Sequence, residues 1–489
     1  MVRHLMAITY TQYRKVLWSK SKQKRDVNKQ TRYRKHNNKV STRKALINYG
    51  GSIFHSTKGQ SISTLNEEDE NLTTEESSRD MFAECHNLRK VPMVSGPCTP
   101  RPRSGHRMCA DDNCIYIFGG FNPAFKTFNE LWRFNTTTEK WSLLPDDDGL
   151  APKSCASSSM VMLGSNLFVF GGTGYPFAKT NSNELFMYSL KMKRWFNLTD
   201  TSSLANRQDF AKHPKDFIKT KQCGCQKFYD RQPVPKYGQG MATAHQKIYI
   251  HSGTQGEEFT KELHSFSLKT FRWTEYEFCF EHTRNAPQPR YRHELASIDN
   301  RLYVLGGALL NETFNFDQLT SFNLQTRKWE QEACQSNKGS SPTTPGESRQ
   351  LPVGRKAHTC VSYKNKIYMC GGYNAVEGML DDFWSFNVNT KEWKQHKNRT
   401  FPYPVQFHSS AVTSYGCMYI HGGLTTKGNR VSDLHQLWLQ VPTLTRMAWM
   451  KVVQQLRDNN QLTKETLIKL KIPRHFIGFI DDKIDVIAA

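Results

Sequence analysis

The sequence has no long apolar run and no regular arrangement of cysteines. None of its hydrophobic stretches approaches the roughly 20 residues that a membrane-spanning helix needs, and the first segment is too basic and too broken by polar residues for a secretory signal. The 12 cysteines lack the spacing of a disulfide framework, and Cys370 and Cys417 stand inside apolar segments. We therefore expect a soluble intracellular protein with free thiols, cytoplasmic with the nucleus as an alternative compartment.

Acidic residues are almost absent from the first 65 residues. This segment holds fifteen Lys or Arg and one acid, Asp26, so it supplies +14 of the net charge of +23. It has no apolar periodicity, and an acidic Ser/Thr-rich run follows from Glu67 to Asp80, so we predict a disordered tail over 1–80. Because aromatic residues lie among the cations, contact with nucleic acid stays an alternative to a solvated tail, as does a mitochondrial presequence. These aromatic residues are Tyr10, Tyr13, Trp18 and Tyr33.

One pattern recurs along the rest of the chain, namely a short apolar run that ends in a glycine pair. Its first copy is Ile115–Gly120, and serine replaces the first glycine in the third copy, at Ser252. The steps between the copies are 52, 81, 54, 65 and 51 residues, a period that indicates a propeller or a solenoid. The six copies end at Gly120, Gly172, Gly253, Gly307, Gly372 and Gly423.

Further strand signals surround each copy. A second apolar segment follows, for example at 130–134, and after a short turn comes a lone tryptophan, so that each repeat predicts the four strands of one propeller blade. The sixth repeat has a third strand at 432–438 but no tryptophan-marked fourth strand. Because 88–92 can be aligned with the outer strand of the first repeat, we expect this N-terminal segment to close the ring. The tryptophans are Trp141, Trp195, Trp273, Trp329 and Trp393.

These segments resemble Kelch repeats over roughly 85–440. The resemblance implies an all-β six-bladed Kelch β-propeller, which we assign to 81–440. Two insertions, at 199–234 and 335–350, are expected to be surface loops. The first contains Cys223 and Cys225, but no second cysteine pair follows at zinc-ligand spacing, so we expect no metal site there.

After Leu439 the β pattern stops, and 441–489 are predicted to form a small helical segment. The first helix should begin after Pro442 and Thr443, the second at Thr463, and the third at Pro473, because each of these residues suits a helix start.

Two short motifs in this tail resemble known binding segments. Leu444, Ala448 and Val452 resemble the BC box, the helix that binds Elongin C in the SOCS and von Hippel-Lindau families, with alanine in place of the more usual cysteine. Ile472, Pro473 and Phe476 resemble a cullin box of the cullin-2 type. Either motif alone is also typical of a plain helical cap.

Taken together, the propeller and the two motifs resemble the Kelch-repeat substrate receptors of cullin-RING ubiquitin ligases. The resemblance implies a non-catalytic receptor with Elongin B/C, cullin-2 and its RING subunit as partners. It also implies that the receptor binds the C-terminal ends of substrate proteins, whose last residue is often glycine. The alternative is a propeller scaffold for signalling or cytoskeletal partners, without a ligase role.

A basic residue precedes five of the glycine pairs at what we interpret as one repeat position. Six-fold geometry would bring these cations together near one mouth of the channel, which favours an anionic ligand such as a terminal carboxylate. The alternative is that each cation pairs with an acid of its own blade. Arg292 is a further candidate without a repeat counterpart. The five cations are Arg103, Lys153, Lys236, Arg290 and Arg355, with Val405 in the sixth repeat, and the predicted walls of the pocket are Phe121, Tyr175, Thr254 and Tyr373.

An enzyme of the copper-oxidase type, built on Kelch-like blades, is a further alternative, because histidine also recurs at one repeat position. Recurrence in several blades favours a structural hydrogen bond over one asymmetric metal site, so we expect neither catalysis nor a cofactor. The histidines are His106, His293, His358 and His408.

Overall fold

The computed structural model describes residues 87–92, 99–153, 155–199, 227–277, 285–336 and 351–480. The predicted tail over 1–80, the Cys223–Cys225 segment and most of both insertions lie outside these residues. The chain divides into two compact units, one comprising 86–440 with 473–489 and the other 1–85 with 441–472. Within the described part, no helix is long and apolar enough to cross a membrane, and seven cysteines are free thiols, as expected.

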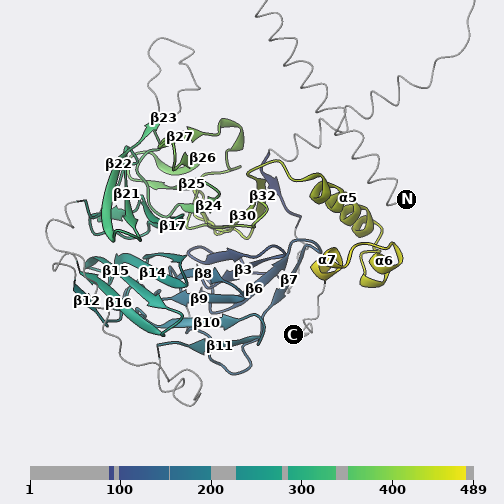
Figure 1. The fold of residues 1–489 in the computed structure, drawn as a ribbon, viewed down its shortest axis with the longest axis horizontal. Coiled ribbons are helices and arrows are strands. Elements are labelled where there is room, and N and C mark those ends of the chain that lie inside the picture. Colours follow the sequence, from purple (N-terminus) through teal and green to yellow (C-terminus); the bar gives the residue numbers. More distant parts are fainter. Residues whose placement is uncertain are drawn as a thin grey trace, which may run out of the picture. The chain divides into compact units, whose positions relative to one another are not determined.

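The propeller consists of six antiparallel sheets, one for each glycine-pair repeat, as predicted (Figure 1). Blade one contains β2 (Arg107–Ala110), β3 (Cys114–Phe118), β6 (Leu131–Asn135) and β7 (Lys140–Leu143). Blade two contains β8 (Ser159–Leu163), β9 (Asn166–Phe170), β10 (Leu185–Ser189) and β11 (Arg194–Asn197). Blade three contains β13 (Gly240–Ala244), β14 (Lys247–Thr254), β15 (Phe259–Ser267) and β16 (Arg272–Glu277), with β12 (Lys227–Tyr229) on its outer edge.

The second half of the ring repeats this arrangement. Blade four contains β17 (Glu294–Ile298), β18 (Arg301–Leu305), β21 (Gln318–Asn323) and β22 (Lys328–Ala333). Blade five contains β24 (Thr359–Tyr363), β25 (Lys366–Asn374), β26 (Gly378–Asn387) and β27 (Glu392–Gln395), with β23 (Gln335–Ser336) parallel to β27, and the short helix η1 (Lys397–Arg399) follows. Blade six contains β29 (Ser409–Val412), β30 (Cys417–His421) and β32 (Leu434–Trp438).

Strand β1 (Arg89–Lys90) supplies the missing fourth strand of blade six. It pairs antiparallel with β32, with Arg89 opposite Gln436 and Lys90 opposite His435. The prediction that 88–92 closes the ring is therefore confirmed. Closure in this way joins the first and last strands of the propeller, so that separating them requires breaking a sheet as well as interblade contacts.

Each tryptophan-marked strand is held by an aromatic pair inside its own blade. The tryptophan lies opposite a Phe or Tyr of the third strand, and the two ring centroids are 5.0–5.1 Å apart in all five blades. Such tilted and edge-to-face contacts add to the stabilisation gained from burial. The pairs are Phe134–Trp141, Tyr188–Trp195, Phe266–Trp273, Phe322–Trp329 and Phe386–Trp393.

The glycine pairs are required where neighbouring blades approach. Gly371 has φ +59°, and a Cβ there would lie 2.8 Å from the carbonyl oxygen of Val405 in the next blade. Gly120 donates its N–H across the same kind of boundary, to the carbonyl of Cys155. In blade three, Ser252 adopts φ +58° and its hydroxyl bonds the Thr260 carbonyl. The pattern that dominates the sequence is thus an interblade joint.

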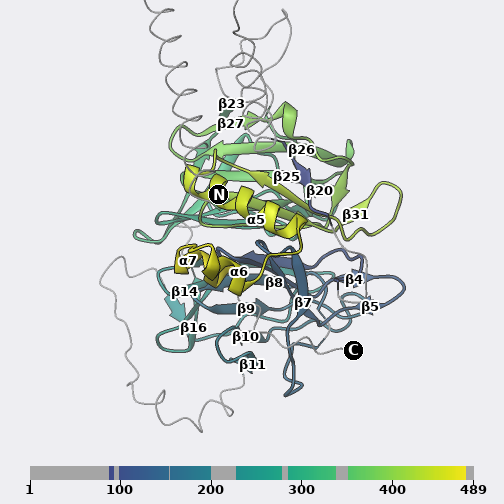
Figure 2. The ribbon, with the colours of Figure 1, turned by 90° about the vertical axis from the view of Figure 1, so that its right-hand side faces the viewer.

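Short hairpins extend the repeats beyond the glycine pairs on one side of the propeller, where Figure 2 places β4, β5, β20 and β31. They are β4 (Phe121–Asn122) with β5 (Lys126–Thr127), β19 (Ala308–Leu309) with β20 (Glu312–Thr313), and β28 (Val405–Gln406) with β31 (Leu424–Thr425).

The tail forms helices where the capping signals predicted them. Thr443 caps α5 (Leu444–Asp458) by accepting from Arg446 N, and Thr463 caps α6 (Lys464–Lys469) in the same way. Pro473 precedes α7 (Arg474–Ile477) and the 3₁₀ turn η2 (Gly478–Ile480). This last turn belongs with the propeller, because Asn135 Nδ2 in blade one donates to the Phe479 carbonyl at 3.0 Å.

Candidate functional site

Three of the predicted binding arginines serve as struts within their own blades. Arg103 Nη1 donates to the carbonyl of Gly119, the first glycine of the pair, and its Nε donates to the carbonyl two residues earlier. Arg290 and Arg355 repeat both bonds, at 2.9–3.1 Å, to Gly306 and Gly371 and to the carbonyls of Gln288 and Val353. Nε and Nη1 of each arginine are therefore committed to holding the interblade joint in shape.

Acids of the same blade complete these sites. Arg103 pairs with Glu130 at 2.7 Å and Lys236 with Glu262 at 3.3 Å. Arg355 forms a bidentate ion pair with Asp382. Burial lowers the pKa of Arg103 and of Lys236. Although burial raises the pKa of Glu130, hydrogen bonds from Arg103 and Trp132 hold it below its usual value. These three cations therefore pair with acids of their own blades, which was the alternative to ligand binding in the sequence analysis.

This geometry corrects the expectation that the repeated cations present free donors to a ligand. The side chains of Arg103 and Arg355 have no solvent exposure, and that of Lys236 is 1% exposed. Arg290 differs because Gln318 stands where the other blades have the acid. It packs over Phe314 at 3.7 Å, and burial lowers its pKa to about 9. Even so, its Nε and Nη1 donate to backbone carbonyls.

Lys153 does not occupy the repeat position to which we assigned it. The second glycine of blade one donates to the carbonyl of Cys155, where four of the other blades use the carbonyls of Lys236, Arg290, Arg355 and Arg103. Cys155 is therefore the structural counterpart of Arg103, and Lys153 lies two residues earlier, exposed to solvent. The alignment failed because the segment 151–157 offers a lysine close to the expected place, and only the interblade hydrogen bond fixes the register.

Two residues after the repeat position of Arg103 and Cys155, the six blades form a closed ring of backbone hydrogen bonds. Each residue donates its N–H to the carbonyl of a neighbouring blade, at 2.6–3.0 Å, and the last bond returns to the first residue. All six have positive φ, between 54° and 67°. Arg292 is a member of this ring, so it has repeat counterparts, although none is charged. The ring consists of Gly105, Phe407, Ala357, Arg292, Gly238 and Ser157.

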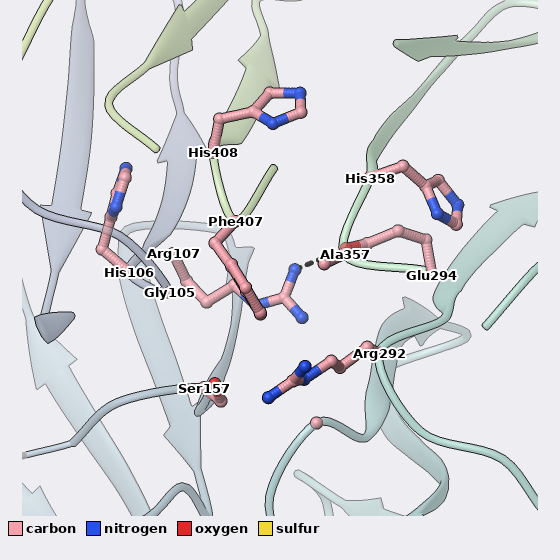
Figure 3. A pocket seen from close by; sticks show the side chains of 11 residues that line it. Gly105, His106, Arg107, Ser157, Arg292, Glu294, Ala357, His358, Phe407 and His408 are labelled. Atoms are coloured by element: carbon pink, nitrogen blue, oxygen red, sulfur yellow. Dashed lines mark hydrogen bonds and ion pairs between the residues drawn. The ribbon is translucent and has the colours of Figure 1, made fainter. Parts of the chain in front are cut away.

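A cavity of about 30 Å³ lies inside this ring (Figure 3). It has room for about two water molecules. Arg107 of blade one and Glu294 of blade four form an ion pair at 2.6 Å, which joins two blades on opposite sides of the ring. Arg107 also donates to the Ser158 carbonyl. The cavity at this level is too small to hold a peptide, so we expect a macromolecular ligand to bind above it.

Arg292, like Arg290, lacks an acidic partner among the described residues. Its guanidinium lies 4.5 Å from the ring of Phe407 and 4.8 Å from that of Tyr291, and its Nε is buried without a hydrogen-bond partner. Burial lowers its pKa, and the groups that oppose this are Tyr291 and Tyr237, which are phenols and not carboxylates. Figure 3 shows Arg292 and Phe407 extending into the same space.

We define the mouth as the residues that follow the glycine pairs together with their β-bridge partners. The predicted wall residues Phe121, Thr254 and Tyr373 occupy one repeat position here, bridged to Ser104, Tyr237 and Lys356. In blade four the bridge joins Ala308 to Tyr291, the residue before Arg292. Tyr175 lies two residues beyond the equivalent Thr173 and stacks on Phe121, with the centroids 5.7 Å apart. The structure therefore gathers the predicted wall residues at one mouth, which Arg292 adjoins.

The repeated histidines form hydrogen bonds between blades. His106 contacts His421 and His293 contacts His251, each at 3.1 Å, while His408 bonds the Cys370 carbonyl. His358 faces blade four, where Leu305 takes the place that His251 and His421 have in their blades. Neither ring nitrogen of His358 has a hydrogen-bond partner. Over the described ranges, no group of three or more His, Cys, Asp or Glu side chains could hold a metal ion. The structural interpretation of the histidines therefore has direct support in three blades.

The candidate partner-binding residues of the tail are divided between the two compact units. On α5, Leu444 and Ala448 are half-buried and Val452 is buried, spaced four residues apart along one side of the helix. Ile472, at the end of the same unit, is buried. Pro473 is exposed and Phe476 is buried, and both belong with the propeller unit. The helices are thus present, while their partners are a matter for experiment.

Comparisons with known proteins agree with the repeat pattern. The family model described as the KLHDC2/KLHL20/DRC7 Kelch-repeats domain matches residues 81–213, 217–345 and 333–464. Kelch domain-containing protein 10 of Rattus norvegicus is 34% identical over 79% of this chain and 87% of its own length. The Homo sapiens protein of that name is 33% identical over 82% and 84%. Kelch domain-containing protein 1 of Homo sapiens is 26% identical over 67% and 76%. The combined propeller and tail motifs resemble Kelch domain-containing protein 10 as well.

Proposed function

Given that the chain belongs to the Kelch-repeat family, whose propellers are protein-interaction domains, we propose that it is the substrate-recognition subunit of a cullin-2 RING ubiquitin ligase. In this proposal the mouth binds the C-terminal end of a target protein, and the tail binds Elongin B/C and cullin-2. The protein itself catalyses nothing. It raises the local concentration of target lysines near the charged ubiquitin, acting in the cytoplasm, with the nucleus as an alternative compartment.

The observation that carries the substrate half is the position of Arg292. The Arg292 side chain is half-buried and its Nε is fully buried, without an acid beside it, so the guanidinium loses solvation that an anion would restore. A terminal carboxylate suits its forked donors, and the small cavity beneath stops the chain from passing deeper. A final glycine has no side chain to hold the carboxylate away from the ring. We therefore transfer the carboxylate-binding role from the repeated cations to Arg292, with Lys356, whose Nζ lies 5.6 Å from the ring of Tyr291, as a further cation of the mouth.

We expect peptides that end in a free glycine carboxylate to bind at least about tenfold more tightly than their C-terminal amides, since one charge-assisted bond is worth about 1.5–3 kcal/mol. The Arg292→Met substitution should abolish this difference, because it should weaken binding of the free-carboxylate peptide and leave binding of the amide unchanged. Fluorescence polarisation with both peptide forms measures it, and melting temperatures check the fold.

Arg194→Met is the matched control, because Arg194 lies on the outer strand β11 and pairs with Asp148. Equal affinities for acid and amide in the unmodified protein would refute carboxylate recognition.

The tail half rests on the order and spacing of the two motifs after a closed propeller. Replacing Leu444 and Pro473 together by alanine should abolish co-purification of Elongin C and cullin-2, because helix docking depends on a few close apolar contacts. Quantitative mass spectrometry of the affinity-purified chain measures the loss. Gln454→Ala on the exposed side of α5 is the control.

If both partners remain bound to the double variant, the motifs do not carry the interaction. If the unmodified chain binds neither partner, the alternative of a scaffold for signalling or cytoskeletal partners replaces the ligase role.

A further inference from the structure

The loops of blades one, two and six carry an exposed group of aromatic and basic side chains. We define the aromatic–cation cluster as Phe121, Tyr175, Phe177, Lys126 and Arg430. Phe121 lies at its centre, with Phe177 at 4.8 Å and Tyr175 at 5.7 Å between ring centroids. Tyr175 and Phe177 also meet edge to face, at 5.8 Å. Residues from separate hairpins thus form one continuous surface.

Two rings of this cluster are open to solvent. Tyr175 is 50% exposed and Phe177 44%, and Phe125, the chain neighbour of Lys126, is 48% exposed. Large aromatic side chains that gather on the surface of a propeller gain nothing for its core, and such residues are enriched where proteins bind one another. The cluster therefore indicates a contact surface.

The charges of the cluster have one sign. Lys126 Nζ lies 4.5 Å from the Tyr175 ring, and the Arg430 guanidinium lies 5.4 Å from that of Phe121. Neither forms an ion pair within the part of the chain that the structure describes. The adjacent loop of blade three carries Glu257 and Glu258, but Glu258 contacts Gln255. A ligand that combines an apolar group with a negative charge complements this surface.

The cluster faces Arg292 across the mouth. Phe121 is bridged to Ser104, the neighbour of Gly105, and Gly105 lies three places from Arg292 in either direction around the ring. With neighbouring strands about 4.8 Å apart, opposite members of a six-membered ring are about 10 Å apart. An extended peptide covers about 3.3 Å per residue, so about three residues span this distance.

We propose that the aromatic–cation cluster is a second subsite, which binds an acidic residue beside an aromatic one, about three to five residues before the substrate's terminal carboxylate. This inference rests on the proposed function, because it takes the carboxylate at Arg292 as its reference point. Single-stranded nucleic acid is the competing class of ligand. The rings of this cluster pack on one another, whereas bases need separate free faces on which to stack, so the geometry favours a peptide.

The test uses the full chain and two synthetic peptides of about ten residues that end in glycine. One carries Glu-Phe at the fourth and fifth places from its end, and the other carries Ala-Ala there. We expect Glu-Phe to bind about tenfold more tightly, a difference that Lys126→Glu with Arg430→Glu should remove. The same double variant should favour a Lys-Phe peptide. Lys191→Glu with Lys394→Glu, two exposed sites on outer strands or turns, controls for net charge.

Measuring each peptide as acid and as amide separates this inference from the proposed function. Loss of the Glu-Phe preference in Lys126→Glu/Arg430→Glu, with the acid–amide difference retained, supports the second subsite. An unchanged preference in this variant overturns the subsite and leaves the carboxylate site standing. Specific binding of a single-stranded oligonucleotide that the same variant loses, without any Glu-Phe preference, also overturns it. Acid–amide equality contradicts the carboxylate site, whatever happens at the cluster.

Discussion

The cations around the mouth of this propeller differ in the groups that satisfy them. Arg103 and Arg355 each bond two backbone carbonyls and a carboxylate of their own blade. Arg292 lies against two aromatic rings instead. The first arrangement is complete without a ligand, while the second leaves N–H donors available. At this scale, therefore, the same residue type divides into structural and ligand-binding roles according to its partners.

Arg103→Met should lower the free energy of unfolding by roughly 3–5 kcal/mol, because it removes the ion-pair partner of Glu130 and the donor to two backbone carbonyls. Lys153→Met, at the exposed residue that resembles Arg103 in sequence, should change it by less than about 0.5 kcal/mol. Urea unfolding followed by tryptophan fluorescence compares the two. Similar losses for both variants, or none for Arg103→Met, would contradict the strut role.

At the scale of strands and helices, the sequence predicted most of the architecture. The glycine pairs predicted the six blades, the segment 88–92 predicted the closing strand, and Thr443 and Thr463 predicted two helix caps. These are local signals, which depend on neighbours along the chain. The pairing of Arg103 with Glu130, 27 residues away, and the exposed place of Lys153 depend on tertiary register. For this reason the mouth could be located from the sequence and Arg292 could be named as a candidate, while the pairing that separates it from the other repeated cations could not be predicted.

For the whole propeller, buried histidines link stability to pH. Burial lowers the pKa of His421 to about 3 and of His408, His264 and His435 to about 4. In the unfolded chain these groups titrate near pH 6.5. The unfolded state therefore binds more protons than the folded state once the pH falls below about 6.5, and stability decreases from there towards pH 4.

We expect the melting temperature to fall steeply between pH 7 and pH 5, because unfolding takes up several protons in this range. Each proton lowers the free energy of unfolding by about 1.4 kcal/mol per pH unit. Burial raises the pKa of Glu294, which opposes this trend by one group. His421→Phe should make the slope shallower by about one proton. A melting temperature that stays constant over this range would show that the histidines are accessible or already charged.

The closed backbone ring has an electrostatic consequence for the mouth. Its six hydrogen bonds all run in the same rotational sense, from Gly105 to Phe407 and onward back to Gly105. Peptide dipoles that add along a helix axis here follow one another around a circle, so their vector sum is close to zero. The ring therefore projects almost no field along the channel. The ring therefore adds little to the attraction of an approaching anion, and exchanging the Arg292 side chain or its neighbours should change the polarity of the mouth without altering the backbone ring beneath it.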